Sequence, residues 1–226
     1  MAGSTGSGKT HALRRLLLPK FPRVVLVDFV GEWERRRREL PGQITVTQSL
    51  GETRAAMVRC ASLGRWSIVA QLAPQDFPQL ARWLVPEKFT DATPIYPRLV
   101  RGCALFNDEF DLVASHSAPP EVFSLFRRGR HVGLSICAAT HTPSSVHPLV
   151  RGLSRYLMLC QMHEVNSIKY FAAVLPPDVF ERLENHLPPR ELLIFDTHTQ
   201  RAVQLSGDNL DHVLWRWEPN AVLDPA

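Results

Sequence analysis

The chain opens with a complete phosphate-binding loop, Gly3-Ser4-Thr5-Gly6-Ser7-Gly8-Lys9-Thr10. Its glycines let the backbone turn its N–H groups toward a polyphosphate, at the positive end of the helix that follows. In this pattern Lys9 reaches the β- and γ-phosphates of ATP, and the Thr10 hydroxyl is placed to ligate Mg²⁺. A Gly/Ser-rich flexible terminus is the alternative, but a helical pattern follows at once, so we assign Gly3 through His11 to nucleotide binding.

Length and composition limit the possible classes of protein. The 226 residues are enough for one α/β domain with a substantial core. A net charge of +4 fits a polyanionic partner without requiring one. We expect no transmembrane segment and no signal peptide, because no apolar run approaches about 20 residues. The cysteines form no C-x-x-C pair, which predicts reduced thiols and a cytoplasmic site: Cys60, Cys103, Cys137 and Cys160.

Apolar runs alternate with helical patterns along the chain, as in an α/β fold with a mostly parallel central sheet flanked by helices. This is the architecture of a P-loop NTPase of the RecA/ASCE-like type. The predicted strands cover 23–28, 43–48, 66–72, 103–108, 134–140, 156–161, 192–196 and 202–205. The predicted helices cover 11–18, 49–64, 74–85, 120–130, 166–174, 178–187 and 208–217, with a long loop over 86–97. We therefore expect one motor domain over 1–226, with a nucleotide-binding half (1–85) and a catalytic half (98–226).

A second motif supplies the acids that a phosphate loop needs. The apolar strand over 103–108 ends in the adjacent carboxylates Asp108 and Glu109, the pattern of a Walker B box. Asp108 is predicted to hold Mg²⁺ through water, and Glu109 to polarise the water that attacks the γ-phosphate. Asn107 departs mildly from the usual apolar residue, and Asp111 is a weaker stand-in because it lies past the strand end. We expect this strand to lie beside the phosphate-loop strand.

The strand that normally precedes a phosphate loop is missing or truncated in this sequence. Only Met1 and Ala2 come before Gly3. We therefore expect an open slot in the sheet beside the Walker B strand, with unpaired backbone groups. Three explanations stay open: a start upstream of this numbering, another segment in the slot, or a loosely anchored loop.

Two further segments carry a resemblance to a known family. The segments RGRHVGLS (128–135) and ATHTP (139–143) resemble a motif of the FtsK/HerA superfamily of ring-forming, DNA-pumping ATPases. The segment DFVGEW (28–33) resembles that superfamily's D-x-x-G-E-[YW] box, and 187–195 resembles its closing L-P-x-x-E strand. With the Walker boxes, the motifs follow in the family's order over roughly residues 3–143.

The resemblance implies roles for single residues. The family's sensor is a Gln, and His141 occupies that place here, where a neutral imidazole can still donate one hydrogen bond. Arg130, and Arg128 as second choice, match the position of an arginine finger that acts on a neighbouring subunit. Glu32 matches a residue that orients nucleotide or water. The structural alternatives are a surface histidine and charges that complement helix dipoles.

The compact length is similar to that of the genome-packaging ATPases of tailless viruses with an internal membrane. That implies a homo-oligomeric ring, most often a hexamer, that uses ATP to thread double-stranded DNA into a preformed capsid. Capsid-vertex or viral membrane proteins would be further partners, and the virion packaging vertex and host cytoplasm the locations. Three alternatives remain: a HerA-like cellular translocase or helicase, a small-molecule P-loop kinase, and a non-catalytic nucleotide-binding scaffold.

The run of four arginines over 35–38 has two interpretations. If the run is helical, its side chains point in several directions, so at most two could face one DNA groove or pore. Contacts to phosphates would be salt-dependent and indifferent to sequence, as a translocating motor needs. A solvated face explains the run equally well.

Overall fold

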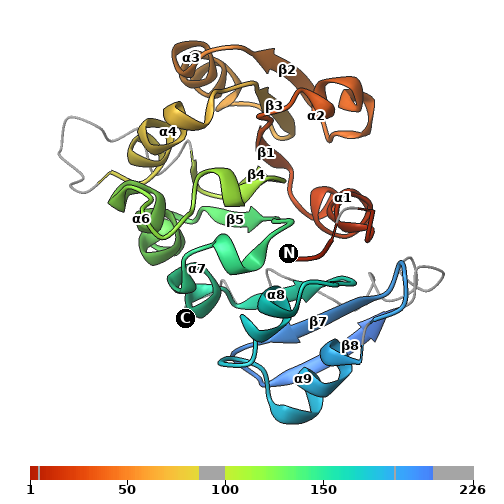
Figure 1. Ribbon diagram of the computed structural model, residues 1–226. Coiled ribbons are helices and arrows are strands. Elements are labelled where there is room, and N and C mark those ends of the chain that lie inside the picture. Colours follow the sequence, from red (N-terminus) through yellow and green to blue (C-terminus); the bar gives the residue numbers. More distant parts are fainter. Residues whose placement is uncertain (5, 87–99, 186, 206–226) are drawn as a thin grey trace.

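A computed structural model describes residues 1–4, 6–86, 100–185 and 187–205. The predicted α/β fold is confirmed: a five-stranded, all-parallel sheet has the order β2-β3-β1-β4-β5 (Figure 1). The three central strands are buried apolar runs, as expected for a sheet covered on both faces, whereas the two edge strands are less buried. The five strands are β1 (Arg23–Val27), β2 (Gln43–Thr47), β3 (Trp66–Ala70), β4 (Cys103–Asn107) and β5 (Ser135–Ala138).

Helices cover both faces of this sheet (Figure 1). One face packs against α3 (Leu50–Cys60), α4 (Phe77–Leu84) and α6 (Pro120–Arg128) around a core that includes Trp66, Phe77 and Phe110. The other face packs against α1 (Lys9–Ala12), its irregular continuation to Lys20, and α2 (Glu32–Arg35). The first helix is therefore shorter than predicted, because a π-turn (Leu13–Leu17) and a 3₁₀ turn containing Pro19 replace regular α-helix.

The last part of the described chain forms a second sheet. Its strands β6 (Tyr156–Leu159), β7 (Leu192–Asp196) and β8 (Arg201–Leu205) pair antiparallel in that order. Helices α8 (Val165–Lys169) and α9 (Pro177–Glu184) cover one face (Figure 1). The alternation of strands and helices ends here, as the consecutive predicted strands 192–196 and 202–205 indicated, because a tight turn after Asp196 joins β7 directly to β8.

The start of the chain joins the two sheets. Ala2 forms parallel bridges to Thr140, just after β5, and to Leu159 of β6. Its N–H donates to the Met158 carbonyl and its carbonyl accepts from the Cys160 N–H, both at 2.8 Å. The phosphate loop therefore starts beside the sensor strand β5. The expectation that it lies beside the Walker B strand was wrong, since β5 separates β4 from Ala2.

Other local predictions differ from the structure at element ends. Helix α7 (Pro148–Leu153) was not predicted, and the helix expected over 166–174 has regular α-helix only to Lys169. The predicted helix over 208–217 and most of the predicted loop over 86–97 lie outside the described residues. Within the described ranges, no helix has the length and apolar character needed to cross a membrane.

Candidate functional site

The phosphate loop takes the conformation that its glycines permit. Gly6 and Gly8 have φ values of 77° and 100°, in the left-handed region that residues with a side chain rarely adopt. Gly3 is required for a different reason: a Cβ there would come within 2.7 Å of the Cys160 Cβ and 2.6 Å of the Ser7 Oγ. The start of the loop therefore packs closely against Cys160, the residue that follows β6. Thr5 lies outside the described residues, and His11 is exposed on α1.

Lys9 is folded back into its own loop. The residue is only 3% exposed, and its Nζ donates to the carbonyl oxygens of Gly3 (2.7 Å) and Ser4 (3.0 Å). The same Nζ lies 2.9 Å from Nδ1 of His141. Burial lowers the pKa of Lys9, and the neighbouring carboxylates, chiefly Asp108, act against that shift. The ammonium group is therefore held where a polyphosphate would arrive.

The loop and the acid pair meet directly. Thr10 Oγ1 donates a 2.8 Å hydrogen bond to Asp108 Oδ2, across 98 residues of sequence. The other oxygen, Asp108 Oδ1, is buried and has no hydrogen-bond partner among the described residues. Oxygens of this kind are what Mg²⁺ prefers, and a P-loop Mg²⁺ takes most of its remaining ligands from phosphates and water. The residues present therefore fit a Mg²⁺ ion held by Thr10 and Asp108.

Acidic groups are concentrated around this point. Burial raises the pKa of Asp108, against the hydrogen bond from Thr10. Burial, then the charges of Asp108 and Asp111, raise the pKa of Glu109. Asp111 Oδ1 is also buried with no hydrogen-bond partner in the described ranges. Such a cluster of carboxylates is unfavourable alone, and a divalent cation would relieve it.

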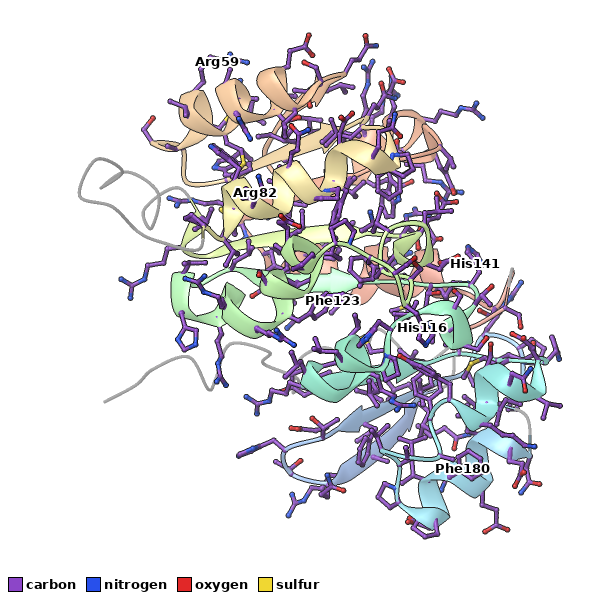
Figure 2. All side chains as sticks on the ribbon, turned by 60° about the vertical axis from the view of Figure 1, so that its left-hand side comes forward. Arg59, Arg82, His116, Phe123, His141 and Phe180 are labelled. Carbon is purple, nitrogen blue, oxygen red and sulfur yellow. The ribbon has the colours of Figure 1, made fainter. Side chains whose placement is uncertain are left out.

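His141 reaches the same place from the carboxyl end of β5. Figure 2 shows it on the side of the molecule where the chain begins. Burial and then the charge of Lys9 lower its pKa, so the imidazole is neutral at pH 7. A neutral ring that accepts from Lys9 at Nδ1 carries its proton on Nε2. In this tautomer the Nε2–H is a donor of the kind that can bond to a phosphate or a water.

The remaining predicted residues are placed differently. Glu32 pairs with Arg36 at 2.8 Å and contributes negative charge near Asp108, Glu109 and His141. Arg128 and Arg130 precede the amino end of β5, whereas the loop and the acids gather at the carboxyl ends of β4 and β5. The structure does not bring these two arginines to the phosphate loop of their own chain.

Two residues, Asp28 and Asn107, have roles that the sequence interpretation missed, and Asp111 was named only as a weaker stand-in. Asp28 caps α2, because its carboxylate accepts from the N–H groups of Glu32 and Trp33 at 3.0 Å and of Glu34 at 3.3 Å. Asn107 Oδ1 accepts from the Glu109 N–H at 3.0 Å and so fixes the turn that carries the acid pair. Although Asp111 lies past the end of β4, its charge acts to raise the pKa values of Lys9, Glu109 and His141. The sequence signal for the role of Asn107 was that a polar residue stands in an otherwise apolar strand.

Solved structures share the fold of this chain at low sequence identity. No protein-family model matches the sequence, and no curated protein matches it. The genome-packaging NTPase B204 of Sulfolobus turreted icosahedral virus 2, solved with AMPPCP, has a TM-score of 0.67 at 16% identity, covering 90% of this chain and 93% of that chain. The chain has the fold of a packaging NTPase. B204 of Sulfolobus turreted icosahedral virus, a DNA-packaging ATPase, gives 0.65 at 14% identity, with 90% and 93% covered.

The comparison with solved structures bears on the fold of this chain. The likeness covers 90% of this chain. The fold predicted from the motifs is thereby confirmed. B204 of the second virus was also solved with ATP-γS.

Proposed function

We propose that this protein is a Mg²⁺-dependent ATPase that drives double-stranded DNA into a preformed viral capsid as a homo-oligomeric ring, a hexamer. One observation carries the ATPase assignment: the Thr10–Asp108 hydrogen bond joins the phosphate loop to the acid pair at the carboxyl edge of the sheet. The packaging assignment is supported by the fold shared with viral packaging NTPases. The virion packaging vertex is the proposed place of action, with capsid-vertex or viral membrane proteins as partners.

Each site residue has a part in this mechanism. The loop amides and Lys9 bind the β- and γ-phosphates, which requires Lys9 to leave the carbonyls of Gly3 and Ser4. Thr10 and Asp108 would hold Mg²⁺, which neutralises charge on the phosphates when bound. Glu109, kept in place by Asn107, accepts a proton from the attacking water. His141, once Lys9 has moved, donates from Nε2 to the γ-phosphate or that water.

Activity in this scheme depends on a second subunit. Arg130 and Arg128 lie at the amino end of β5, away from the loop of their own chain. In a ring they can serve a neighbour's γ-phosphate, where an arginine finger is worth about 10³–10⁵ in rate. The proposed arginine finger therefore requires the proposed ring.

The test is ATP turnover with and without long duplex DNA, together with particle mass. We expect Mg²⁺-dependent hydrolysis that DNA stimulates, and loss of turnover by at least about 10²-fold in Glu109→Gln. Unchanged turnover in Glu109→Gln would favour the scaffold interpretation, and phosphate transfer to a nucleoside would favour a kinase. A monomer under all conditions, with ATP and DNA present, would contradict the finger and the ring.

A further inference from the structure

A turn of the second sheet lies against the phosphate loop. Because β7 runs antiparallel to β6, the residues that lead into β7 lie at the carboxyl end of β6, where the loop begins. Gly8 marks the contact: a Cβ placed there would lie 3.9 Å from the Cα of Arg190. A residue with a long, charged side chain is therefore held directly beside the loop.

Arg190 has a backbone conformation that is unusual for its side chain. Its φ is 67°, in the left-handed region that glycine adopts easily and an arginine adopts only under strain. Among the described residues other than glycine, only Gln200 shares a positive φ, and Gln200 belongs to the tight turn between β7 and β8. The chain thus carries an arginine at a position whose backbone favours glycine.

The neighbours of Arg190 impose this conformation. Two prolines, at 188–189, come directly before it, and their rings fix φ at both positions. The Glu191 N–H then closes a turn by donating to the carbonyl of the first proline at 3.1 Å. Leu187 and Leu192 are buried on either side and anchor the turn in the core. Strained residues that their surroundings hold in place cluster at ligand-binding sites, so the strain at Arg190 is itself an indication of function.

The side chain of Arg190 suits a polyphosphate. It is exposed, and no ion pair joins it to another residue of the described ranges. Lys9, in contrast, is buried and donates to carbonyls of its own loop. A guanidinium group can donate two parallel hydrogen bonds to one phosphate, a geometry that a lysine does not offer. Arg190 therefore adds a second kind of phosphate-binding group next to the loop.

We propose that Arg190 is a nucleotide-binding residue that contacts the phosphate groups of ATP held by the loop at Gly8. This inference rests on the proposed function, because it requires that the loop binds ATP. It adds a binding residue from a different sheet, far from the loop in the sequence. A bound nucleotide would then be held jointly by the loop and by the turn that leads into β7.

The experiment compares ligand binding by the full chain and three variants. Arg190→Gly removes the charge and the strain, whereas Arg190→Gln removes the charge and keeps a side chain that the chain itself tolerates at a positive φ in Gln200. Gln200→Gly is the matched control, because it relieves the same kind of strain at the opposite end of β7. The Kd is measured by calorimetry for MgATP and for magnesium tripolyphosphate, which has no base or ribose. The Tm of each ligand-free protein is measured as well.

We expect both Arg190 variants to bind MgATP and tripolyphosphate about tenfold more weakly, because each has lost a charged donor to phosphate. Gln200→Gly should leave both Kd values unchanged. The Tm of each glycine variant should stay within about 3 °C of the original chain, because relief of strain and the greater freedom of glycine in the unfolded chain oppose each other.

An unchanged Kd for MgATP in both Arg190 variants would overturn this inference and leave the proposed function intact. Weaker binding of MgATP with unchanged binding of tripolyphosphate would also overturn it, since Arg190 would then contact the base or the ribose. Equal weakening in Gln200→Gly would show that the backbone, and not the charge, is the cause. If the original chain binds neither ligand, both the proposed function and this inference are wrong.

Discussion

At the scale of single residues, His141 is where this chain departs from the Gln of the FtsK/HerA superfamily that it resembles. Its contact with Lys9 requires a neutral ring, and burial and Lys9 both lower its pKa. Around it lie the charges of Asp108, Asp111 and Glu32, which act in the opposite direction. Unlike a Gln, the residue therefore keeps its contact with Lys9 only while it is uncharged.

We predict that His141→Gln keeps turnover within a few-fold at pH 8 and weakens its dependence on acid pH. As pH falls through the lowered pKa of His141, the ring gains a proton, is repelled by Lys9, and can no longer accept from it. Wild-type kcat should therefore fall more steeply below pH 6.5 than that of His141→Gln. The measurement is kcat for MgATP from pH 5.5 to 8.5. In both proteins, protonation of Glu109 lowers kcat at acid pH. Identical pH profiles of kcat would therefore count against the sensor role of His141.

Glu109 should lower the stability of the ligand-free protein. Its pKa is raised, so its ionised form is less favourable in the folded chain; the destabilisation is absent below the ordinary carboxyl pKa and complete above the raised one. Glu109→Gln is therefore expected to raise the Tm by roughly 1–3 °C at pH 8 but not at pH 4. The control is Glu181→Gln, on the exposed side of α9. A higher Tm for Glu109→Gln at both pH values would indicate that packing, and not the charge of Glu109, causes the effect.

The sequence predicted most of the residues that meet at the site. Phosphate chemistry fixes residue types and positions at strand ends, so the sequence could indicate which side chains lie together. They are Lys9, Thr10, Asp108, Glu109 and His141, and their catalytic roles stay predictions. The roles of Asp28 and Asn107 were not found. Their side chains bond to nearby backbone N–H groups, and such bonds depend on turn geometry that residue type alone leaves open.

At the scale of elements, α2 depends on one buried carboxylate. Asp28 is 3% exposed and accepts from three N–H groups at the start of this four-residue helix. We predict that Asp28→Ala lowers the free energy of unfolding by about 2–3 kcal/mol, because these donors lose a charged acceptor. The measurement is the guanidinium midpoint at constant m-value. Asp76→Ala is the matched control, since Asp76 precedes α4 and its side chain makes no cap hydrogen bond; an equal loss there would contradict the capping role.

Strand positions were predictable, whereas strand neighbours were not. All eight predicted strands exist within the described residues, because each is a short apolar run with a recognisable period. Local pattern does not encode which run pairs with which, so β5 was not expected between β4 and Ala2. The same limit explains the antiparallel β6-β7-β8 sheet. Helix α7 was missed because six residues are too few to show a helical period.

At the scale of the whole molecule, the position of Arg130 fits the proposed finger that acts on a neighbouring subunit. Arg130 is exposed just before β5, at the sheet edge opposite the phosphate loop. A subunit that lacks Arg130 would keep its own nucleotide site, and a subunit that lacks Lys9 would keep its finger. Defects in the two residues should therefore complement each other across an interface.

We predict that Arg130→Ala and Lys9→Ala each lower DNA-stimulated turnover by at least about 10²-fold, and that mixing the two proteins restores part of it. In mixed rings, an intact Lys9 site faces an intact Arg130 from its neighbour. The measurement is ATP turnover against mixing ratio, which should pass through a maximum between the two pure proteins. Arg59→Ala controls for loss of positive charge, because Arg59 lies on the outside of α3 (Figure 2) and should leave turnover unchanged. If the mixtures follow a straight line, Arg130 acts within its own subunit or not at all, and Arg128→Ala mixed with Lys9→Ala becomes the deciding pair.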